Sequence, residues 1–143
     1  MINKIINRFA NPLDLLGRLL VAYVFVGAGF AKIGGYDHTV AFMESVGLSG
    51  VLLPLVILTE IGGGILLALG YQTRLAAIAI AGFSILAAIF FHADWSVEAN
   101  RFSFLRNLAI MGALLSYVSA GVRGWSIDAW LEKKNLDKRD STE

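Results

Sequence analysis

The chain has 143 residues, of which 57% are apolar and only 16% are charged, and its net charge is +1. Its mean hydropathy is +0.67. Soluble domains contain about 45–50% apolar residues, so this composition indicates an integral membrane protein, and the near-neutral charge gives no case for binding nucleic acid. Cysteine is absent, which excludes thiolate catalysis, disulfide exchange, iron–sulfur ligation and cysteine-bound zinc.

Four apolar segments predict four membrane-crossing helices, at about residues 13–33, 51–70, 75–91 and 104–120. Each has roughly the 20 residues that a helix needs to cross about 30 Å of hydrocarbon. The predicted fold is therefore all-α, an integral membrane four-helix bundle formed by residues 1–128. Residues 129–143 are predicted to form a charged, amphipathic cytoplasmic tail.

Lysine and arginine in the flanking segments predict the orientation of the bundle. The N-terminal segment carries Lys4 and Arg8, and the turn between the second and third apolar segments carries Arg74. The C-terminal segment carries Arg123, Lys133, Lys134, Lys138 and Arg139. Because such residues favour the cytoplasmic side, we expect both termini on that side, and we call the opposite side the outer side.

Both ends of the chain predict amphipathic helices lying on the membrane surface. At the N-terminus, apolar residues recur at the spacing i, i+3, i+4, i+7, in Ile2, Ile5, Ile6 and Phe9. At the C-terminus, Ser126 is a plausible N-cap for a helix that carries Trp130 and Leu131. A further short helix is expected over Thr39–Val46 in the first outer loop, ending at Gly47.

Polar groups within or beside the apolar segments are the candidate ligand-binding or proton-relay residues: Lys32, Glu60, His92, Asn107, Arg18 and Thr59. Inserting a carboxylate as deep in the membrane as Glu60 costs at least ~2.5 kcal/mol of free energy on insertion scales. Helical side chains lean toward the N-terminus of their own helix. With both termini cytoplasmic, Lys32 and His92 lean into the membrane while Glu60 and Asn107 lean outward, so the four are expected to converge in the outer half of the bundle.

Lys32 is expected close to the outer surface, and Glu60 about 13 Å deep at 1.5 Å per residue. Two long side chains leaning together can close that gap, directly or through a water molecule. Glu60 then has two interpretations. It is either a structural ion-pair partner that holds the bundle together, or a carboxylate that binds a ligand or exchanges protons.

Arg18 also has two interpretations. Near the cytoplasmic end of the first helix it can extend to lipid headgroups, or it can pair with Glu60 if that helix lies deeper. The two histidines, His38 and His92, both fall on the outer side, with His38 in a loop. Haem is therefore not expected, and no recognised metal-ligand spacing occurs.

An ordered series of short motifs resembles the DoxX family of small bacterial inner-membrane proteins. The resemblance covers nearly everything from about Leu13 to Asp128. Val122 departs from a Gly-Pro-Gly pattern in many relatives. The motifs are Gly17-Arg18-Leu19, Gly27-Ala28-Gly29-Phe30-Ala31-Lys32-Ile33, Glu60-Ile61-Gly62-Gly63-Gly64, Leu69-Gly70-Tyr71-Gln72-Thr73-Arg74, His92, Arg106-Asn107 and Gly121-Val122-Arg123-Gly124-Trp125-Ser126-Ile127-Asp128.

This resemblance implies a four-helix fold in the bacterial inner membrane. Some family members are linked to thiosulfate oxidation with a quinone as acceptor, and others to thiol-redox complexes. The resemblance therefore implies a quinone-linked redox subunit of an oxidoreductase, with redox proteins as partners. Because this chain lacks cysteine, we expect it to bind the quinone or a partner rather than to perform a sulfur step.

Two other functions stay open from the sequence alone. The chain can be a structural or assembly protein that binds other membrane proteins, with its buried polar groups holding the bundle. It can also be a transporter of a small solute, which would require a homo-oligomer because four spans leave little room for two gated halves. Membrane lipid is an expected partner in every case.

Overall fold

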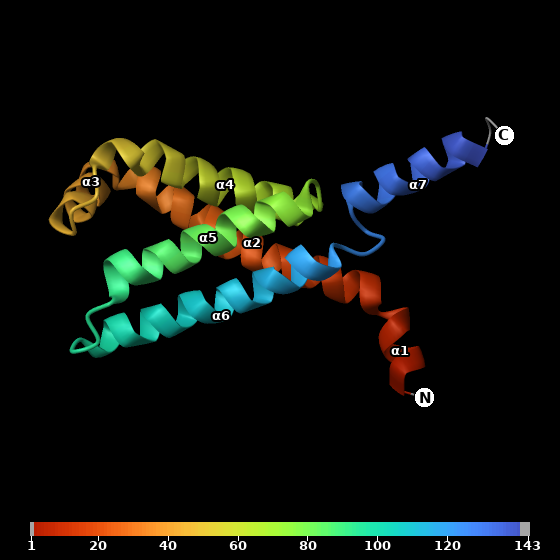
Figure 1. Cartoon of the computed structure of the whole chain (residues 1–143), viewed down its shortest axis with the longest axis horizontal. Coiled ribbons are helices and arrows are strands. Elements are labelled where there is room, and N and C mark those ends of the chain that lie inside the picture. The colour runs from red at the N-terminus through yellow and green to blue at the C-terminus, as the bar shows by residue number, and fades with distance from the viewer. Residues whose placement is uncertain (1, 141–143) are drawn as a thin grey trace.

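A computed structural model describes residues 2–140, which contain seven α-helices, one short 3-10 helix and no strand. Figure 1 shows how they follow one another along the chain. We call the end of the bundle that carries α3 the α3 end, and the opposite end the α7 end. The elements are α1 (Ile2–Arg8), α2 (Ala10–Gly34), α3 (Tyr36–Ser45), η1 (Gly50–Leu52), α4 (Leu53–Leu69), α5 (Thr73–His92), α6 (Glu98–Ala120) and α7 (Ile127–Asp140).

Four helices are long and apolar enough to cross a membrane: α2, η1 with α4, α5 and α6, of 25, 20, 20 and 23 residues. The predicted all-α membrane bundle is confirmed. Two boundaries differ from the prediction, since α2 begins at Ala10 and α6 begins at Glu98. The apolar segments mark only the stretch suited to hydrocarbon, whereas the helical backbone continues into the polar residues beside it.

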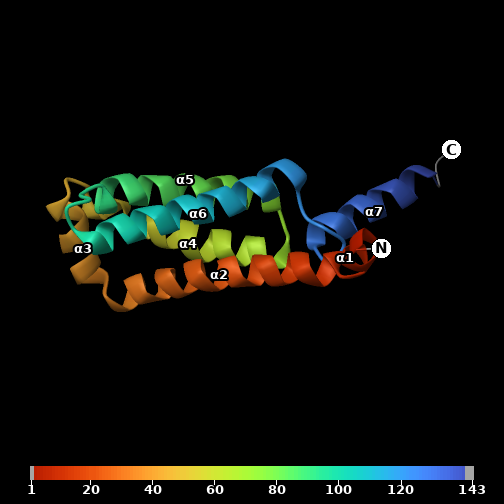
Figure 2. The ribbon, with the colours of Figure 1, turned by 90° about the horizontal axis from the view of Figure 1, so that it is seen from below.

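The bundle is built by neighbouring pairs: α2 packs on α4, α4 on α5 and α5 on α6. Figure 2 shows α2 along one side of the molecule and α5 and α6 along the other. The buried core joins α2, α4, α5 and α6 through Phe25, Leu67, Ala77, Ile80, Ala81 and Leu114. Small side chains on α5, including Ala76, Ala77 and Ala81, let its neighbours approach closely.

The turn between α4 and α5 is formed by Gly70. Its φ of 63° lies in the left-handed region, which glycine adopts without the steric penalty of a side chain. Its N–H bonds the carbonyl of Leu67 at 3.1 Å, and the N–H of Tyr71 bonds the carbonyl of Leu66 at 3.0 Å. These two bonds form a Schellman motif, which ends α4 and reverses the chain within three residues.

The expected outer-loop helix is present as α3, and Gly47 follows it with a φ of 81°. Helices also form at both ends of the chain, and Ser126 caps α7 through a bond from the Ala129 N–H to Ser126 Oγ at 3.2 Å.

That α1 and α7 lie on a membrane surface stays a prediction. So does the division at residue 128, which falls inside α7; the tail's last three residues, 141–143, lie outside the described part.

Candidate functional site

Lys32 on α2 and Glu60 on α4 form a direct ion pair, with Lys32 Nζ 2.7 Å from Glu60 Oε1. The Glu60 side chain is 3% exposed and that of Lys32 is 27% exposed. The expected approach of these two side chains is therefore confirmed, without a water molecule between them. Lys32 neutralises a carboxylate that would otherwise be buried and unpaired.

Close packing of α2 on α4 brings the pair together. Gly29 lies one turn before Lys32 on the same face of α2, and a Cβ at this position would collide with Ile61 and lie 3.4 Å from Glu60 Cβ. On α4, a Cβ at Gly64 would lie 2.8 Å from a methyl carbon of Val26. Glycine at both positions lets the two backbones approach, so that Lys32 reaches Glu60.

Beside the ion pair lies a cavity of about 950 Å³ toward the α3 end. Most of its lining is apolar, and it includes Phe25, Met43, Phe83 and Phe91. All spanning helices and α3 contribute to it. Its polar lining residues are Lys32, Thr39, Thr59, Glu60, His92, Arg106 and Asn107. The structure thus brings five of the six predicted site residues to one cavity.

The polar groups of this cavity differ in what they still offer a ligand. Asn107 donates to the carbonyl of Ser103 at 2.9 Å, and Thr59 donates to that of Leu55 at 2.8 Å, both within their own helices. Glu60 Oε2 and His92 Nδ1 are buried and have no hydrogen-bond partner. Buried polar atoms are normally paired, so these two atoms are the ones most available to a bound molecule.

Arg18 lies elsewhere, and both interpretations made for it were wrong. Its side chain is completely buried near the α7 end, so it does not extend to the membrane surface, and its bonding partners do not include Glu60. Its guanidinium binds Asp14 Oδ2 at 3.0 Å, the carbonyl of Ala68 at 2.7 Å, that of Leu67 at 3.3 Å and that of Trp125. Arg18 therefore joins the last turn of α4 to the segment before α7.

Asp128 completes this second network. It accepts bonds from the backbone N–H groups of Gln72 and Thr73, both at 2.9 Å, and from Thr73 Oγ1 at 2.8 Å. A carboxylate here satisfies the free N–H groups that begin α5 and complements the positive end of its dipole. Asp128 also donates its own N–H to the carbonyl of Gly70 at 2.8 Å, which fixes the start of α7 to the α4–α5 turn.

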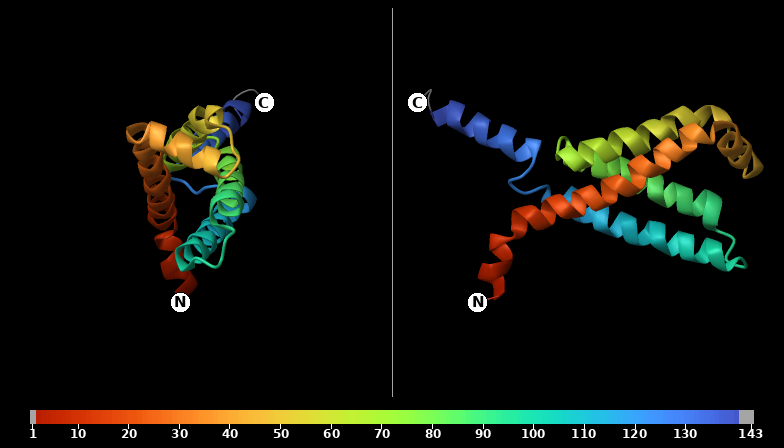
Figure 3. Two further views of the ribbon diagram at one scale, coloured as in Figure 1. Left: turned by 90° about the vertical axis from the view of Figure 1, so that its left-hand side faces the viewer. Right: turned by 180° about the vertical axis from the view of Figure 1, so that it is seen from behind.

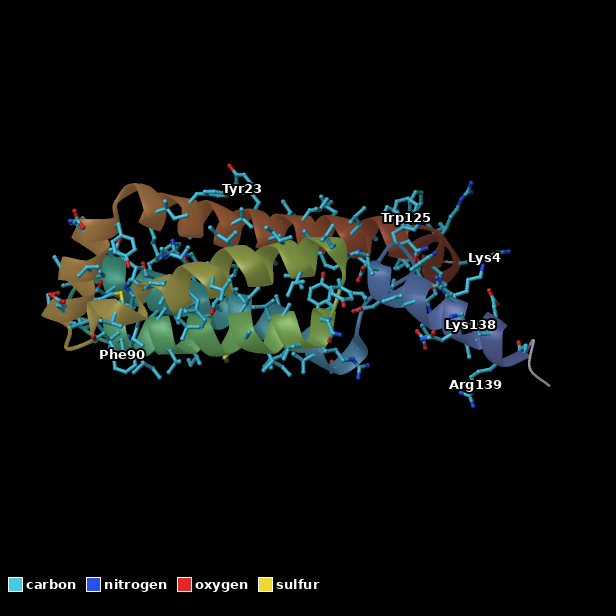
Figure 4. The ribbon with its side chains drawn as sticks, turned by 90° about the horizontal axis from the view of Figure 1, so that it is seen from above. Lys4, Tyr23, Phe90, Trp125, Lys138 and Arg139 are labelled. Atoms are coloured by element: carbon cyan, nitrogen blue, oxygen red, sulfur yellow. The ribbon has the colours of Figure 1, made fainter. Side chains whose placement is uncertain are left out.

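The Arg18 network lies at the α7 end of the bundle, and the Lys32–Glu60 pair lies farther toward the α3 end. Figure 4 shows Trp125, Lys4, Lys138 and Arg139 at the α7 end, and Phe90 at the α3 end. The Arg18 network could not be recognised in the sequence, because three of its four acceptors are backbone carbonyls. Of the motifs noted in the sequence, those around Arg18, Gly70 and Asp128 build the α7 end, whereas those around Lys32 and Glu60 adjoin the cavity.

No cluster of three potential metal ligands among His, Asp and Glu occurs within residues 2–140. Asp94, in the connection between α5 and α6, instead accepts bonds from Ser96 Oγ at 2.6 Å and from the Ser96 N–H at 3.0 Å. These bonds lower the pKa of the Asp94 carboxyl. Asp94 is therefore engaged in a local turn.

Four helices able to cross a membrane, two of them joined by a buried ion pair beside an apolar cavity, define a small multi-pass membrane protein. The DoxX family model matches residues 13–93, which include Arg18, Lys32, Glu60 and Gly70. The chain belongs to the DoxX family. The matched region ends just after α5, so α6 and α7 lie beyond it.

Three relatives extend the comparison. Inner membrane protein YqjF of Escherichia coli is 42% identical over 120 residues, covering 84% of this chain and 92% of that protein. Inner membrane protein YphA of the same organism is 32% identical and covers 83% and 91%, respectively. The Surfeit locus protein 4 homolog of Drosophila melanogaster is 26% identical over 89% of this chain but only 44% of its own length. No solved structure matches the chain.

Proposed function

We propose that this chain binds a quinone in the cavity beside Glu60 and acts as a quinone-linked subunit in the bacterial inner membrane. The observation that carries the proposal is the buried Glu60 carboxylate, which pairs with Lys32 through Oε1 while Oε2 has no partner. Two bacterial relatives are named inner membrane proteins. The lysine and arginine distribution supports placing both termini in the cytoplasm, with the α3 end toward the outer side.

The size and lining of the cavity suit such a molecule. Small-molecule sites commonly measure about 300–1,000 Å³ and combine an apolar lining with a few polar groups, and this cavity holds about 950 Å³. A quinone has a flat, six-membered ring as its head and a hydrocarbon isoprenoid chain as its tail. The aromatic lining residues Phe25, Phe83 and Phe91 offer contacts for both.

The hydrogen-bonding groups that line the cavity also suit a quinone. A quinone carbonyl needs a donor, which the Lys32 ammonium, the His92 ring and the second N–H of the Asn107 amide can supply. A quinol hydroxyl needs an acceptor, which Glu60 Oε2 supplies. The two oxidation states of one ligand thus find opposite partners in the same cavity, and a bound quinone would supply two-electron, two-proton chemistry.

The residues of this chain would hold and orient the ligand. Glu60 would accept the hydroxyl hydrogen bond while Lys32 keeps the carboxylate fixed from its other oxygen. The chain has no cysteine, so the electrons would be exchanged with a partner redox protein. This proposal assigns Glu60 and Lys32 to ligand binding rather than to an enzymatic reaction of the isolated chain.

A second candidate is a purely structural role, because the glycine-lined contact of α2 with α4 surrounds the same ion pair. In that case Lys32 and Glu60 would only hold two helices together, and the protein would act as an assembly factor for other membrane proteins. The two candidates differ in whether removal of the Glu60 charge changes the bound small molecules or only the stability.

The test is mass spectrometry of small molecules extracted from protein purified in nanodiscs from a quinone-producing bacterium. Wild type is compared with Glu60→Gln and with the control Asp37→Asn, an acid-to-amide change on the exposed face of α3 outside the cavity. Quinone retained by wild type and the control but lost in folded Glu60→Gln supports the proposal. Equal quinone in all three samples, at or below the level of empty nanodiscs, rejects it.

A further inference from the structure

The cavity beside Glu60 is bounded by two helices that separate toward the α3 end. Near the α7 end α2 and α6 meet, with Tyr117 Oη 3.5 Å from the carbonyl oxygen of Asp14, and a Cβ at Gly17 would lie 2.8 Å from that hydroxyl. Figures 1 and 3 show the two helices diverging from there. In the diverging part, Val24 and Ala28 of α2 line the cavity from one side, and Asn107 and Ile110 of α6 line it from another.

The α3 end of the same cavity is covered. Phe42 of α3 stacks on Phe91 of α5, with ring centroids 5.1 Å apart and an angle of 23° between the rings. Met43 of α3 is 3% exposed, and both Phe42 and Met43 line the cavity. Helix α3 therefore covers this end of the cavity, and the left view of Figure 3 shows α3 lying across this end of the bundle.

We infer that the ligand is an amphiphile with a long hydrocarbon chain that enters sideways from the bilayer between α2 and α6, while α3 closes the cavity toward water. This inference rests on the proposed ligand-binding role of Glu60 and Lys32. The polar head reaches the ion pair, and the chain stays in the opening that Val24, 52% exposed, borders. Lys32 stands on the helix that forms one edge of this opening.

The energetics of transfer favour this path. Moving a hydrocarbon chain from bilayer to water costs about 0.8 kcal/mol for each CH₂ group, so an isoprenoid or acyl chain would meet a large barrier at a water-filled entrance. A sideways path keeps the chain in hydrocarbon throughout. Only the head must leave the interfacial region, and the polar groups of the cavity receive it.

The absence of cysteine allows a direct test. A single cysteine at Ala87, on the α5 wall of the cavity, is labelled with bimane in nanodiscs. Quenching is then measured with acyl-brominated phospholipid and with aqueous iodide. Tyr23→Cys provides the lipid-facing reference, because Tyr23 is 81% exposed and points away from α2 in Figure 4. Asp94→Cys, in the exposed connection after α5, provides the aqueous reference.

We expect the label at Ala87 to be quenched by brominated lipid to a level close to that at Tyr23, and to be protected from iodide. Adding Phe42→Ala should admit iodide to the Ala87 label without changing its quenching by lipid. Iodide quenching of the Ala87 label in the unaltered background would overturn the inference, because the cavity would open to water. Protection of the Ala87 label from both quenchers would also overturn the inference, because α6 or another chain would then close the opening between α2 and α6.

This experiment is independent of the extraction test. The quenching pattern reports the opening whether or not a quinone is bound, whereas quinone retention reports the role of Glu60. If the Ala87 label is quenched by lipid but no quinone is retained by the wild type, only the proposed function is contradicted. If the Ala87 label is protected from lipid quenching while quinone is lost only in Glu60→Gln, only the sideways entry of the ligand is contradicted.

Discussion

Lys32 and Glu60 lie 28 positions apart in the chain, and their 2.7 Å contact ties α2 to α4 deep in the bundle. The pair uses only one carboxylate oxygen, and the other faces no protein partner. The ion pair is therefore both a helix–helix contact and an incomplete polar site. A stability cycle at these two residues tests the first property, and ligand labelling of Glu60→Gln tests the second.

Lys32→Met should destabilise the protein by about 2 kcal/mol, because it leaves the buried Glu60 carboxylate unpaired; the partial exposure of Lys32 keeps the loss below that of a fully buried pair. Thermal unfolding in detergent measures the change. Adding Glu60→Leu to this variant should restore much of the lost stability, since no unpaired charge then remains. Strictly additive losses in the four-variant cycle would show that the two side chains are not coupled.

Arg18→Lys should be nearly as damaging as Arg18→Ala, with a loss of roughly 2–4 kcal/mol. A lysine ammonium cannot replace the planar fork that reaches Asp14 and three carbonyls at once. Thermal unfolding of both variants tests this expectation. A lysine variant as stable as wild type would indicate that the arginine acts as a simple positive charge near the membrane surface.

Gly70→Ala should lower stability by about 1–3 kcal/mol. The new Cβ would occupy a left-handed backbone position, collide with Ser126 Cβ and lie 2.7 Å from Arg18 Nη1. Gly82→Ala is the matched control, since a Cβ there meets nothing within 4 Å, and in a helix interior it should be neutral or stabilising by up to ~1 kcal/mol. Equal effects of the two substitutions would contradict this account of the α4–α5 turn.

Asp128→Asn should loosen α7 from the bundle and cost about 1 kcal/mol, because an uncharged amide is a weaker cap for the start of α5. Hydrogen exchange should accelerate at the amides of Gln72 and Thr73 and in the first turn of α7. Asp137→Asn, farther along α7, is the control and should leave exchange at Gln72 and Thr73 unchanged. If the two variants gave the same exchange pattern, Asp128 would not fix α7.

Much of the fold follows from the sequence because its signals are local. Four apolar stretches of sufficient length predict the spanning helices, Gly47 and Ser126 mark helix ends, and the lean of helical side chains predicts that Lys32 approaches Glu60. The start of α6 was missed by six residues, since Glu98 and Arg101 are polar yet helical. Hydropathy reports the hydrocarbon stretch of a helix and not its full length.

The Arg18 network could not be predicted, because its acceptors have no side-chain signature. The carbonyls of Leu67 and Ala68 become acceptors only because α4 ends there, and that of Trp125 only because the chain returns from α6 to the same place. Asn107, which was expected to converge with Glu60, lines the same cavity. The bonds that Asn107 and Thr59 make within their own helices were not foreseen. The sequence predicts which groups are near one another better than it predicts how each is bonded.

Photolabelling with an azido-quinone in nanodiscs would show whether a quinone head binds beside Glu60. Labelled peptides are mapped by mass spectrometry in wild type and in Glu60→Gln. We expect labels on cavity-lining residues of α2, α4, α5 and α6, competed by excess unlabelled quinone and lost in folded Glu60→Gln. Labels spread over lipid-facing positions such as Tyr23, uncompeted and unchanged in Glu60→Gln, would contradict it.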